Sequence, residues 1–265
     1  MKAAVWKGPN ILEIEDVPEP KPGPDEVKLK IAFCGMCGTD PEILAGHFPP
    51  VKPPRINGHE SSGTIVEMGS NVQGFRVGQR VAVNFRTACG GCYYCHNRME
   101  HFCEHIHQAT GGFAEYATFH KNSVYPLADD ISMEVGAFTE PVSVAVHAID
   151  LANIQPGRSV AILGGGVIGL LLLQTAIRAG AAKTLVSEPV AEKRQLAKSL
   201  GADITVDPMN ENLEQIGKDF TDCHGFDTVI DATGKIGPAK QAVFMAAKCG
   251  TVLWAAVYPE HSEIA

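Results

Sequence analysis

Residues 160–169 read Val-Ala-Ile-Leu-Gly-Gly-Gly-Val-Ile-Gly, an apolar strand pattern that passes through G-x-G-x-x-G into an apolar helix pattern. In this context Gly164 permits a tight turn, Gly166 lets the backbone approach a pyrophosphate, and Gly169 allows close packing of helix on strand. The helix N-terminus would face the phosphates, because its free N–H groups and its dipole attract anions. The stretch therefore predicts a nucleotide-binding unit, against the alternative of a Gly-rich turn without a ligand.

The residues that follow extend this predicted nucleotide site. Val167 and Ile168 open the helix, and Glu188 ends the next strand pattern about 20 residues further on. An acid at this place hydrogen-bonds the ribose hydroxyls and repels a 2'-phosphate, so Glu188 predicts NAD rather than NADP. Lys193, one helical turn beyond, is either a second ribose contact or a solvated helix lysine.

The chain changes pattern near its middle. Its first part has short strands broken by Pro and Gly, which predicts an antiparallel, barrel-like domain. From Ser159 onward strands alternate with helices, which predicts a parallel sheet covered on both faces. We expect domains at residues 1–150 and 151–265, with Pro156-Gly157 as the hinge. The expected strands of the second domain are 159–163, 184–187, 204–206, 228–231 and 251–257, and its expected helices include 167–179 and 190–200.

Four cysteines in the first domain have the spacing of a metal site. Cys89, Cys92 and Cys95 are separated by two residues each, and Cys103 follows after seven more. Four thiolates close a tetrahedral shell and leave no open position, so the spacing predicts a structural zinc in a lobe at residues 85–108. The alternatives are four reduced thiols or two disulfides.

A second group of metal-binding residue types is spread over the first domain. It comprises Cys37, His59, Glu60 and Glu140, the last placed before Pro141 at the start of an expected helix. One thiolate, one imidazole and one or two carboxylates could hold a zinc ion with an open position for water or substrate. Each residue alone would more often be structural, and only their joint appearance predicts a site.

Composition excludes some classes of function. The 265 residues carry 22 basic and 30 acidic side chains, a net charge of -8 that argues against binding nucleic acid through its phosphates. Mean hydropathy is +0.01. The longest apolar stretch, residues 161–177, is shorter than the roughly 20 residues that span a membrane. No apolar leader segment follows Met1, and we therefore expect a cytoplasmic protein.

The motifs together resemble the zinc-dependent medium-chain alcohol dehydrogenase family, in its polyol and secondary-alcohol branch of sorbitol, threonine and butanediol dehydrogenases. Gly58-His-Glu-x-x-Gly63, followed by Gly69 and Val72, matches the zinc signature of this family. The four-cysteine lobe, the segment at residues 111–116 and the nucleotide fingerprint follow in the order of the family. The resemblance implies a GroES-like antiparallel β-barrel domain followed by a Rossmann doubly wound sheet.

The resemblance also implies the site chemistry. Cys37 and His59 would bind the catalytic zinc, and Glu140 stands where alcohol dehydrogenases have a second cysteine. Whether Glu140 or Glu60 binds directly stays open. The implied reaction moves hydride from an alcohol, polyol or sugar to NAD, while Thr39 accepts the alcohol proton. The next relay residue of the family, a histidine, is Glu42 here, so the further route of the proton is not predicted.

The end of the chain departs from the family. The Rossmann sheet has six strands in this family, whereas five are expected here, so we expect a C-terminally truncated chain that binds zinc but holds NAD weakly. The longer family form would be a homo-oligomer. A non-catalytic, zinc-stabilised remnant is one alternative function. A zinc-free quinone or enoyl reductase is another, although its members lack both zinc sites.

Overall fold

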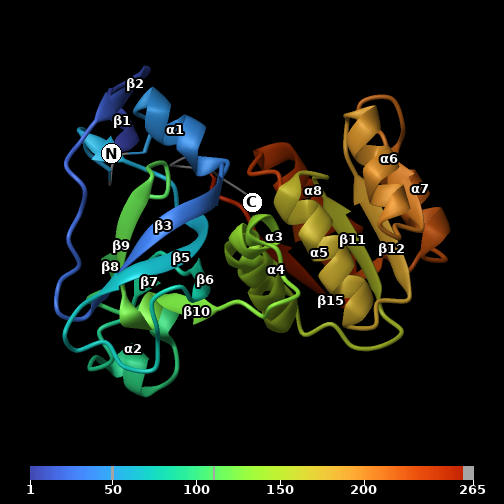
Figure 1. Ribbon diagram of the computed structural model, residues 1–265. Helices are drawn as coiled ribbons and strands as arrows, with labels where there is room; N and C mark the ends of the chain where they lie inside the picture. Colours follow the sequence, from blue (N-terminus) through green and yellow to red (C-terminus); the bar gives the residue numbers. More distant parts are fainter. Residues whose placement is uncertain (49–50, 110, 259–265) are drawn as a thin grey trace. The chain divides into compact units, whose positions relative to one another are not determined.

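The computed structural model describes residues 1–48, 51–109 and 111–258. The chain folds into two compact units, Met1–Glu140 and Pro141–Ala265 (Figure 1). The expected domain boundary at residue 150 lies inside helix α4 (Thr139–Ala152), and Pro156-Gly157 follows this helix within the second unit. The described part of the chain contains no helix that is long and apolar enough to span a membrane.

Antiparallel sheets make up most of the first unit. A five-stranded sheet has the order β10-β6-β5-β3-β9, a three-stranded sheet the order β2-β1-β4, and β7 pairs with β8. All of these pairings are antiparallel. The strands are β1 (Lys2–Gly8), β2 (Ile11–Asp16), β3 (Glu26–Gly35), β4 (Arg55–Ile56), β5 (Glu60–Met68), β6 (Arg80–Val83), β7 (Arg86–Thr87), β8 (His107–Gln108), β9 (Tyr116–His120) and β10 (Val124–Pro126).

Short helices connect these strands. They are α1 (Thr39–Ala45), α2 (Tyr93–His96), η1 (Glu100–Phe102), η2 (Lys121–Ser123) and α3 (Met133–Ala137). Helix α1 ends at Gly46, which adopts a left-handed conformation with φ of 80° and donates its N–H to carbonyls of the last turn. Because α1 is short and directly follows β3, the residues between them are held close to the end of that strand.

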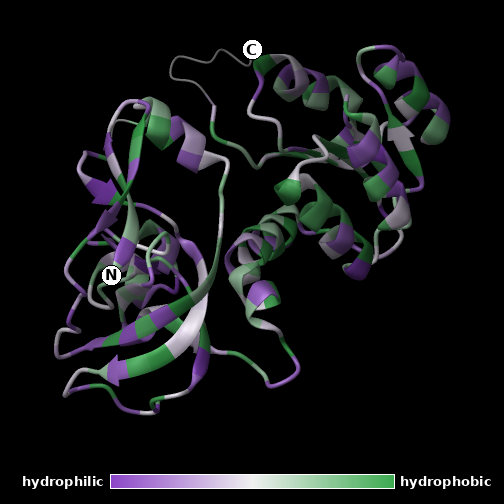
Figure 2. Cartoon of the chain, turned by 45° about the horizontal axis from the view of Figure 1, so that its top comes forward, coloured by the Kyte–Doolittle hydropathy of each residue, from purple (hydrophilic) through white to green (hydrophobic). Residues whose placement is uncertain are grey.

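The core of the first unit follows the period of its strands. Val27 and Leu29 of β3 are fully buried, and they pack with Ile65, Val81 and Phe119 from neighbouring strands. Figure 2 shows both hydrophobic and hydrophilic residues along the strands of this unit. These core residues cover one face of the sheet, and part of the other face is also buried, as Lys28, Ser62 and Ala82 show.

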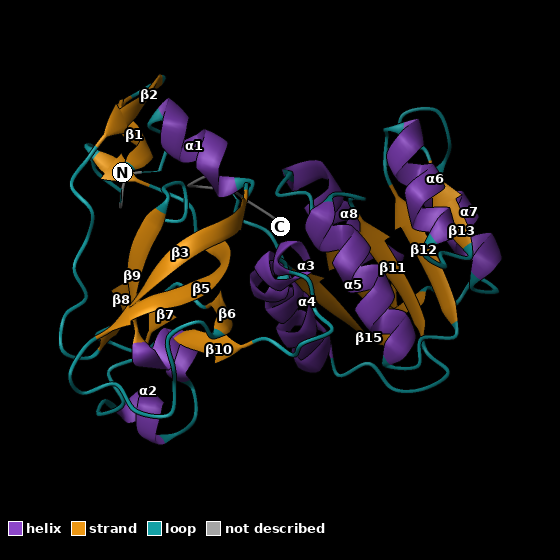
Figure 3. Cartoon of the chain, in the orientation of Figure 1, coloured by secondary structure: helices purple, strands orange, loops and turns teal. Residues whose placement is uncertain are grey.

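A parallel sheet forms the centre of the second unit. Its order is β13-β12-β11-β14-β15, and every pairing is parallel. Helices join successive strands (Figure 3). The elements are β11 (Ser159–Leu163), α5 (Val167–Arg178), β12 (Lys183–Ser187), α6 (Ala191–Ser199), β13 (Ile204–Val206), α7 (Leu213–Phe220), β14 (Phe226–Asp231), α8 (Ile236–Met245) and β15 (Ala246–Trp254).

Both faces of this sheet are buried. Val160 and Ile162 of β11 pack in one apolar cluster with residues of α4 and α5. Ala161 and Leu163, which point to the opposite face, pack in a second cluster with residues of α7 and α8. Every residue of β11 is buried, which explains its apolar sequence from Val160 to Leu163. The prediction of a parallel sheet covered on both faces is confirmed.

The observed bounds of the parallel strands match the predicted bounds for some strands and differ for others. Strands β11 and β13 have the expected bounds, and β12 and β14 begin one and two residues earlier. Strand β15 was expected at 251–257 but runs from Ala246 to Trp254, at the edge of the sheet among the described residues. The parallel order brings the carboxyl ends of β11, β12 and β14 to one edge, which is where ligands of such sheets bind.

Candidate zinc and nucleotide sites

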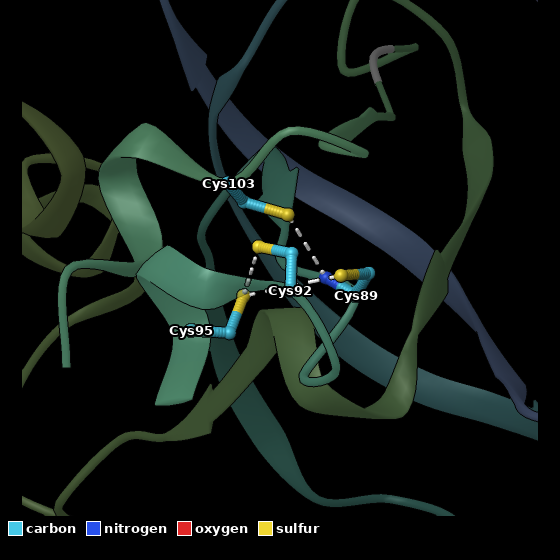
Figure 4. A group of neighbouring side chains, drawn as sticks. All are labelled: Cys89, Cys92, Cys95 and Cys103. Carbon is cyan, nitrogen blue, oxygen red and sulfur yellow. Dashed lines mark hydrogen bonds between the residues drawn. The ribbon is translucent and has the colours of Figure 1, made fainter. Parts of the chain in front are cut away.

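The four cysteines of the lobe converge on one point (Figure 4). Their sulfur atoms all lie within 4.8 Å of one another, with Cys92 and Cys95 3.5 Å apart and Cys89 and Cys95 4.0 Å apart. These distances are far too long for disulfides. Four sulfurs at about 2.3 Å from a zinc ion are about 3.8 Å from one another, so the observed spacing fits a tetrahedral zinc site.

Local backbone structure orients these thiols. Cys92 precedes α2 and Cys103 follows η1, while backbone N–H groups of Cys89 and His105 both donate to the Cys103 sulfur at 3.3 Å. N–H groups of Cys95 and Glu104 lower the pKa of Cys92 to about 6. Donors aimed at sulfur stabilise thiolates, the form that binds zinc. The residues present therefore fit the predicted structural zinc.

Three residues of the second group also converge. Donor atoms of Cys37, His59 and Glu60 lie within 4.8 Å of one another. Cys37 follows β3, and Glu60 is the first residue of β5, which pairs with β3 so that Gly35 lies opposite Glu60. Phe85 packs against the imidazole of His59, with ring centroids 4.8 Å apart. Adjacent antiparallel strands thus bring together residues that are 22 positions apart in the sequence.

Glu140 lies near this group without belonging to it. It stands in the first turn of α4. Burial raises the pKa of Glu140, and the charges of His59 and Glu60 also act on it. Burial likewise raises the pKa of Glu60 and of Cys37. A thiol and two carboxyl groups that share one partly desolvated place fit a divalent cation, which would offset the cost of their charges.

Asp40 is a site residue that sequence reasoning missed. Its carboxylate accepts a hydrogen bond from the backbone N–H of Cys37 at 2.9 Å and so fixes the turn that carries this thiol. Asp40 is 9% exposed, and its Oδ1 has no partner among the described residues. Asp40 directly follows Thr39, and its place three residues after Cys37 was the available signal, because an acid there can accept the N–H of a preceding turn.

Thr39 lies beside the metal-binding group. Its hydroxyl is 3.6 Å from the Cys37 sulfur, at the first position of α1. Glu42, where the family relay has a histidine, pairs instead with His47, whose Nδ1 lies 3.3 Å from the Glu42 carboxylate. Both side chains are exposed, at 61% and 72%. The structure thus pairs Glu42 of α1 with a histidine that follows the C-cap of this helix.

The Gly-rich turn has the geometry that its sequence predicts. Gly164 adopts a φ of 103°, and a β-carbon on Gly169 would lie 1.8 Å from the carbonyl oxygen of Gly164. Gly166 is the N-cap of α5, has no capping side chain, and faces open space where a β-carbon would point. Val167 and Ile168 begin the helix, which leaves the first N–H groups of α5 available to an anion.

The Glu188 carboxylate is hydrogen-bonded to the Gly-rich turn. Its carboxylate accepts hydrogen bonds from the N–H of Gly165 at 2.8 Å and of Val190 at 3.0 Å. The side chain is 5% exposed, and a β-carbon on Gly165 would lie 3.0 Å from it. The acid is therefore fixed against the turn that would hold the pyrophosphate. Lys193 is exposed on α6, close in sequence to this edge.

Comparisons with known proteins agree with this arrangement. Residues 23–129 match the family described as alcohol dehydrogenase GroES-like domain, and residues 167–264 match the family described as zinc-binding dehydrogenase. L-threonine 3-dehydrogenase from Pyrococcus abyssi is 35% identical over 254 residues, covering 93% of this chain and 73% of that protein. The chain belongs to the zinc-binding alcohol dehydrogenase family.

Other members confirm the predicted branch and fold. Sorbitol dehydrogenase from Halalkalibacterium halodurans is 34% identical, covering 94% of this chain and 75% of that protein. A zinc-binding dehydrogenase from Sinorhizobium meliloti, crystallised with NADP, has a TM-score of 0.95 and 36% identity, covering 100% of this chain and 79% of that chain. The expected class, a zinc- and nicotinamide-dependent oxidoreductase with GroES-like and Rossmann units, is confirmed.

Proposed function

We propose that this family member transfers hydride between a secondary alcohol, polyol or sugar and NAD at the site formed by Cys37, His59 and Glu60. The observation that carries this proposal is the convergence of three different metal-binding donors within 4.8 Å, beside the hydroxyl of Thr39. A mixed thiolate, imidazole and carboxylate set that leaves a coordination position open is typical of catalytic zinc. The closed four-cysteine site would hold a second, structural zinc.

Each residue of the site has a distinct proposed role in hydride transfer. A bound zinc would supply Lewis acidity to the alcohol oxygen. Thr39 would relay the alcohol proton, because its hydroxyl can accept that proton while it releases its own proton toward solvent. Asp40 keeps Cys37 in place through the 2.9 Å hydrogen bond to its N–H. The raised pKa of Glu60 and of Glu140 supports a role for both near the cation, Glu60 within the converging group and Glu140 beside it.

NAD is the proposed cofactor, held by Gly164, Gly166, Val167, Ile168 and Gly169. A buried, hydrogen-bonded carboxylate at Glu188 supports NAD, because it would repel a 2'-phosphate. Lys193 is a proposed further ribose contact. NADP is the second candidate, and the NADP complex of the Sinorhizobium relative favours it.

We also propose that the protein is a cytoplasmic homo-oligomer without nucleic-acid or membrane partners. The net charge of -8 supports the absence of phosphate-backbone binding. Large apolar side chains near the edge strand β15 support self-association, because Phe244 is 76% exposed and Trp254 44% exposed. Size-exclusion chromatography with light scattering tests the oligomer.

Zinc content tests the two metal sites separately. We expect about two zinc equivalents per chain in the purified protein, and the loss of one in Cys37→Ser and of the other in Cys103→Ser. Hydride transfer would then be followed as NADH absorbance with a panel of polyols and secondary alcohols. Both NADH formation and one zinc equivalent should vanish in Cys37→Ser.

Other zinc counts would contradict the proposal. One equivalent that only Cys103→Ser removes would mean that the catalytic site is empty, which favours the non-catalytic remnant. A protein without zinc that nevertheless reduces quinones would favour the zinc-free reductase.

A further inference from the structure

Arg194 holds together the backbone that presents Glu188. Its guanidinium donates to the carbonyl oxygens of Glu188 and Pro189, both at 2.7 Å. Arg194 lies in the first turn of α6, six residues beyond Glu188. The side chain therefore folds back along its own helix onto the end of β12, the edge where the adenosine ribose would bind.

Asp207 keeps this arginine in place. Its carboxylate lies 3.2 Å from the Arg194 guanidinium, and the two side chains are only 14% and 20% exposed. Strands β12 and β13 are parallel with Ser187 opposite Val206, so Glu188 and Asp207 follow neighbouring strands side by side. The N–H of Glu188 also donates to the carbonyl of Val206 at 3.0 Å.

The Asp207 side chain is itself fixed by its loop. The N–H of Met209 donates to Oδ1 at 3.0 Å, and the side-chain amide of Asn210 donates to Oδ2 at 3.1 Å. The N–H of Met209, the Asn210 amide and the charge of Arg194 lower the pKa of Asp207. Asp207 is thus a charged and preorganised partner for Arg194 at neutral pH.

We propose that Asp207 is a second determinant of cofactor choice, because it withholds the Arg194 guanidinium from the 2'-phosphate of NADP. An arginine near the end of this strand is the group that accommodates a 2'-phosphate in Rossmann folds. Here Nη1 of Arg194 already donates to two carbonyls, and Nη2 faces the Asp207 carboxylate. Selection against NADP would then have two parts, repulsion by Glu188 and neutralisation of Arg194 by Asp207.

The inference about Asp207 rests on the proposed nucleotide site. Binding assays can distinguish a failure of the inference from a failure of the nucleotide site. Fluorescence titration with NADH and with NADPH would be compared for the wild type and for Asp207→Asn, which keeps an acceptor for the Met209 N–H. We expect NADPH to bind about threefold to tenfold more tightly to the variant, with NADH changed by less than about twofold. This gain should fall as salt concentration rises.

Two further variants make the test specific. In Asp207→Asn combined with Arg194→Gln, the gain in NADPH affinity should disappear, because the liberated guanidinium is absent. Asp227→Asn is the matched control: it breaks an Arg158–Asp227 pair of 2.7 Å that involves the other end of the sheet, before β11 and in β14. It should leave the ratio of NADH to NADPH affinity unchanged.

Three other binding results would contradict the proposed role of Asp207. An unchanged affinity ratio in a folded Asp207→Asn protein would overturn the role of Asp207 while leaving the nucleotide site intact. A gain that survives Arg194→Gln would also overturn it, and would assign the phosphate to another cation such as Lys193. A wild type that binds neither nucleotide would instead refute the proposed cofactor site and the inference together.

Discussion

Two glycines show how positions without a side chain shape both sites. A β-carbon on Gly35 would lie 2.2 Å from Oε2 of Glu60, and one on Gly165 would lie 3.0 Å from Cβ and Cγ of Glu188. The contact at Gly35 is essentially absent for real β-carbons, and the contact at Gly165 is tight enough that Glu188 would have to shift slightly. The carboxyl side chains of Glu60 and Glu188 therefore each rest against a glycine from another strand or turn.

Gly35→Ala should remove the catalytic zinc and spare the structural one. The added methyl group would displace the Glu60 carboxylate from its place opposite Gly35 in the β3 and β5 pairing. We expect zinc content, measured by inductively coupled plasma mass spectrometry, to fall from about two equivalents to about one. Gly38→Ala is the matched control, since no heavy atom lies within 4 Å of its added β-carbon. Two retained equivalents in folded Gly35→Ala would show that Glu60 is not needed for zinc.

Thr39 offers a second test at the scale of one residue. Its hydroxyl lies 3.6 Å from the Cys37 sulfur and is the proposed acceptor of the alcohol proton. Thr39→Val keeps the shape and removes the hydroxyl, so we expect kcat to fall by about 100-fold or more. Thr39→Ser should recover most of the rate, because it restores the hydroxyl. Equal rates in Thr39→Val and Thr39→Ser would exclude a proton-transfer role.

At the scale of elements, the sequence predicted the strands and helices whose hydrophobic pattern has only one interpretation. Strand β11 is apolar from Val160 to Leu163 because both of its faces are buried, and its bounds were predicted correctly. Helix α7 was missed, although Leu213, Ile216 and Phe220 are spaced as on one helical face. Strand β15 was misplaced because its pairing with β14 shifts register, with Cys249 at a φ of 63°.

Two helical glycines differ in what an added methyl group would contact. A β-carbon on Gly169 in α5 would meet the Gly164 carbonyl at 1.8 Å, whereas one on Gly237 in α8 would meet nothing within 4 Å. We expect Gly169→Ala to lower the free energy of unfolding, measured in urea, by about 1–3 kcal/mol through overpacking. Gly237→Ala should give no such loss by overpacking, but Pro238 offsets the expected entropy gain, because proline disfavours a helical backbone at a preceding residue with a β-carbon. A stabilising Gly169→Ala would contradict the close contact.

At the scale of the whole molecule, the sequence predicted which residues lie together wherever a short motif contains all of them. The cysteine spacing and the Gly-rich turn specify their geometry locally, and the structure gathers Cys37, His59 and Glu60 as the motifs suggested. Asp40, Arg194 and Asp207 were missed. The Arg194–Asp207 pair forms only because β12 and β13 lie side by side, and no local pattern encodes such a contact.

The response of the whole fold to acid tests the ion pair at Asp227. Burial alone would raise the pKa of Asp227, but the N–H and hydroxyl of Ser159 and the guanidinium of Arg158 lower it below the ordinary value of 3.8. A carboxyl group with a lowered pKa stabilises the fold above its unfolded pKa, and this contribution is lost as pH falls through the folded pKa. Asp227→Asn should therefore unfold at lower urea concentration than the wild type at pH 7. The difference should shrink below about pH 3.8. A difference that stays constant from pH 7 to about pH 3 would show that the carboxylate charge does not stabilise this protein.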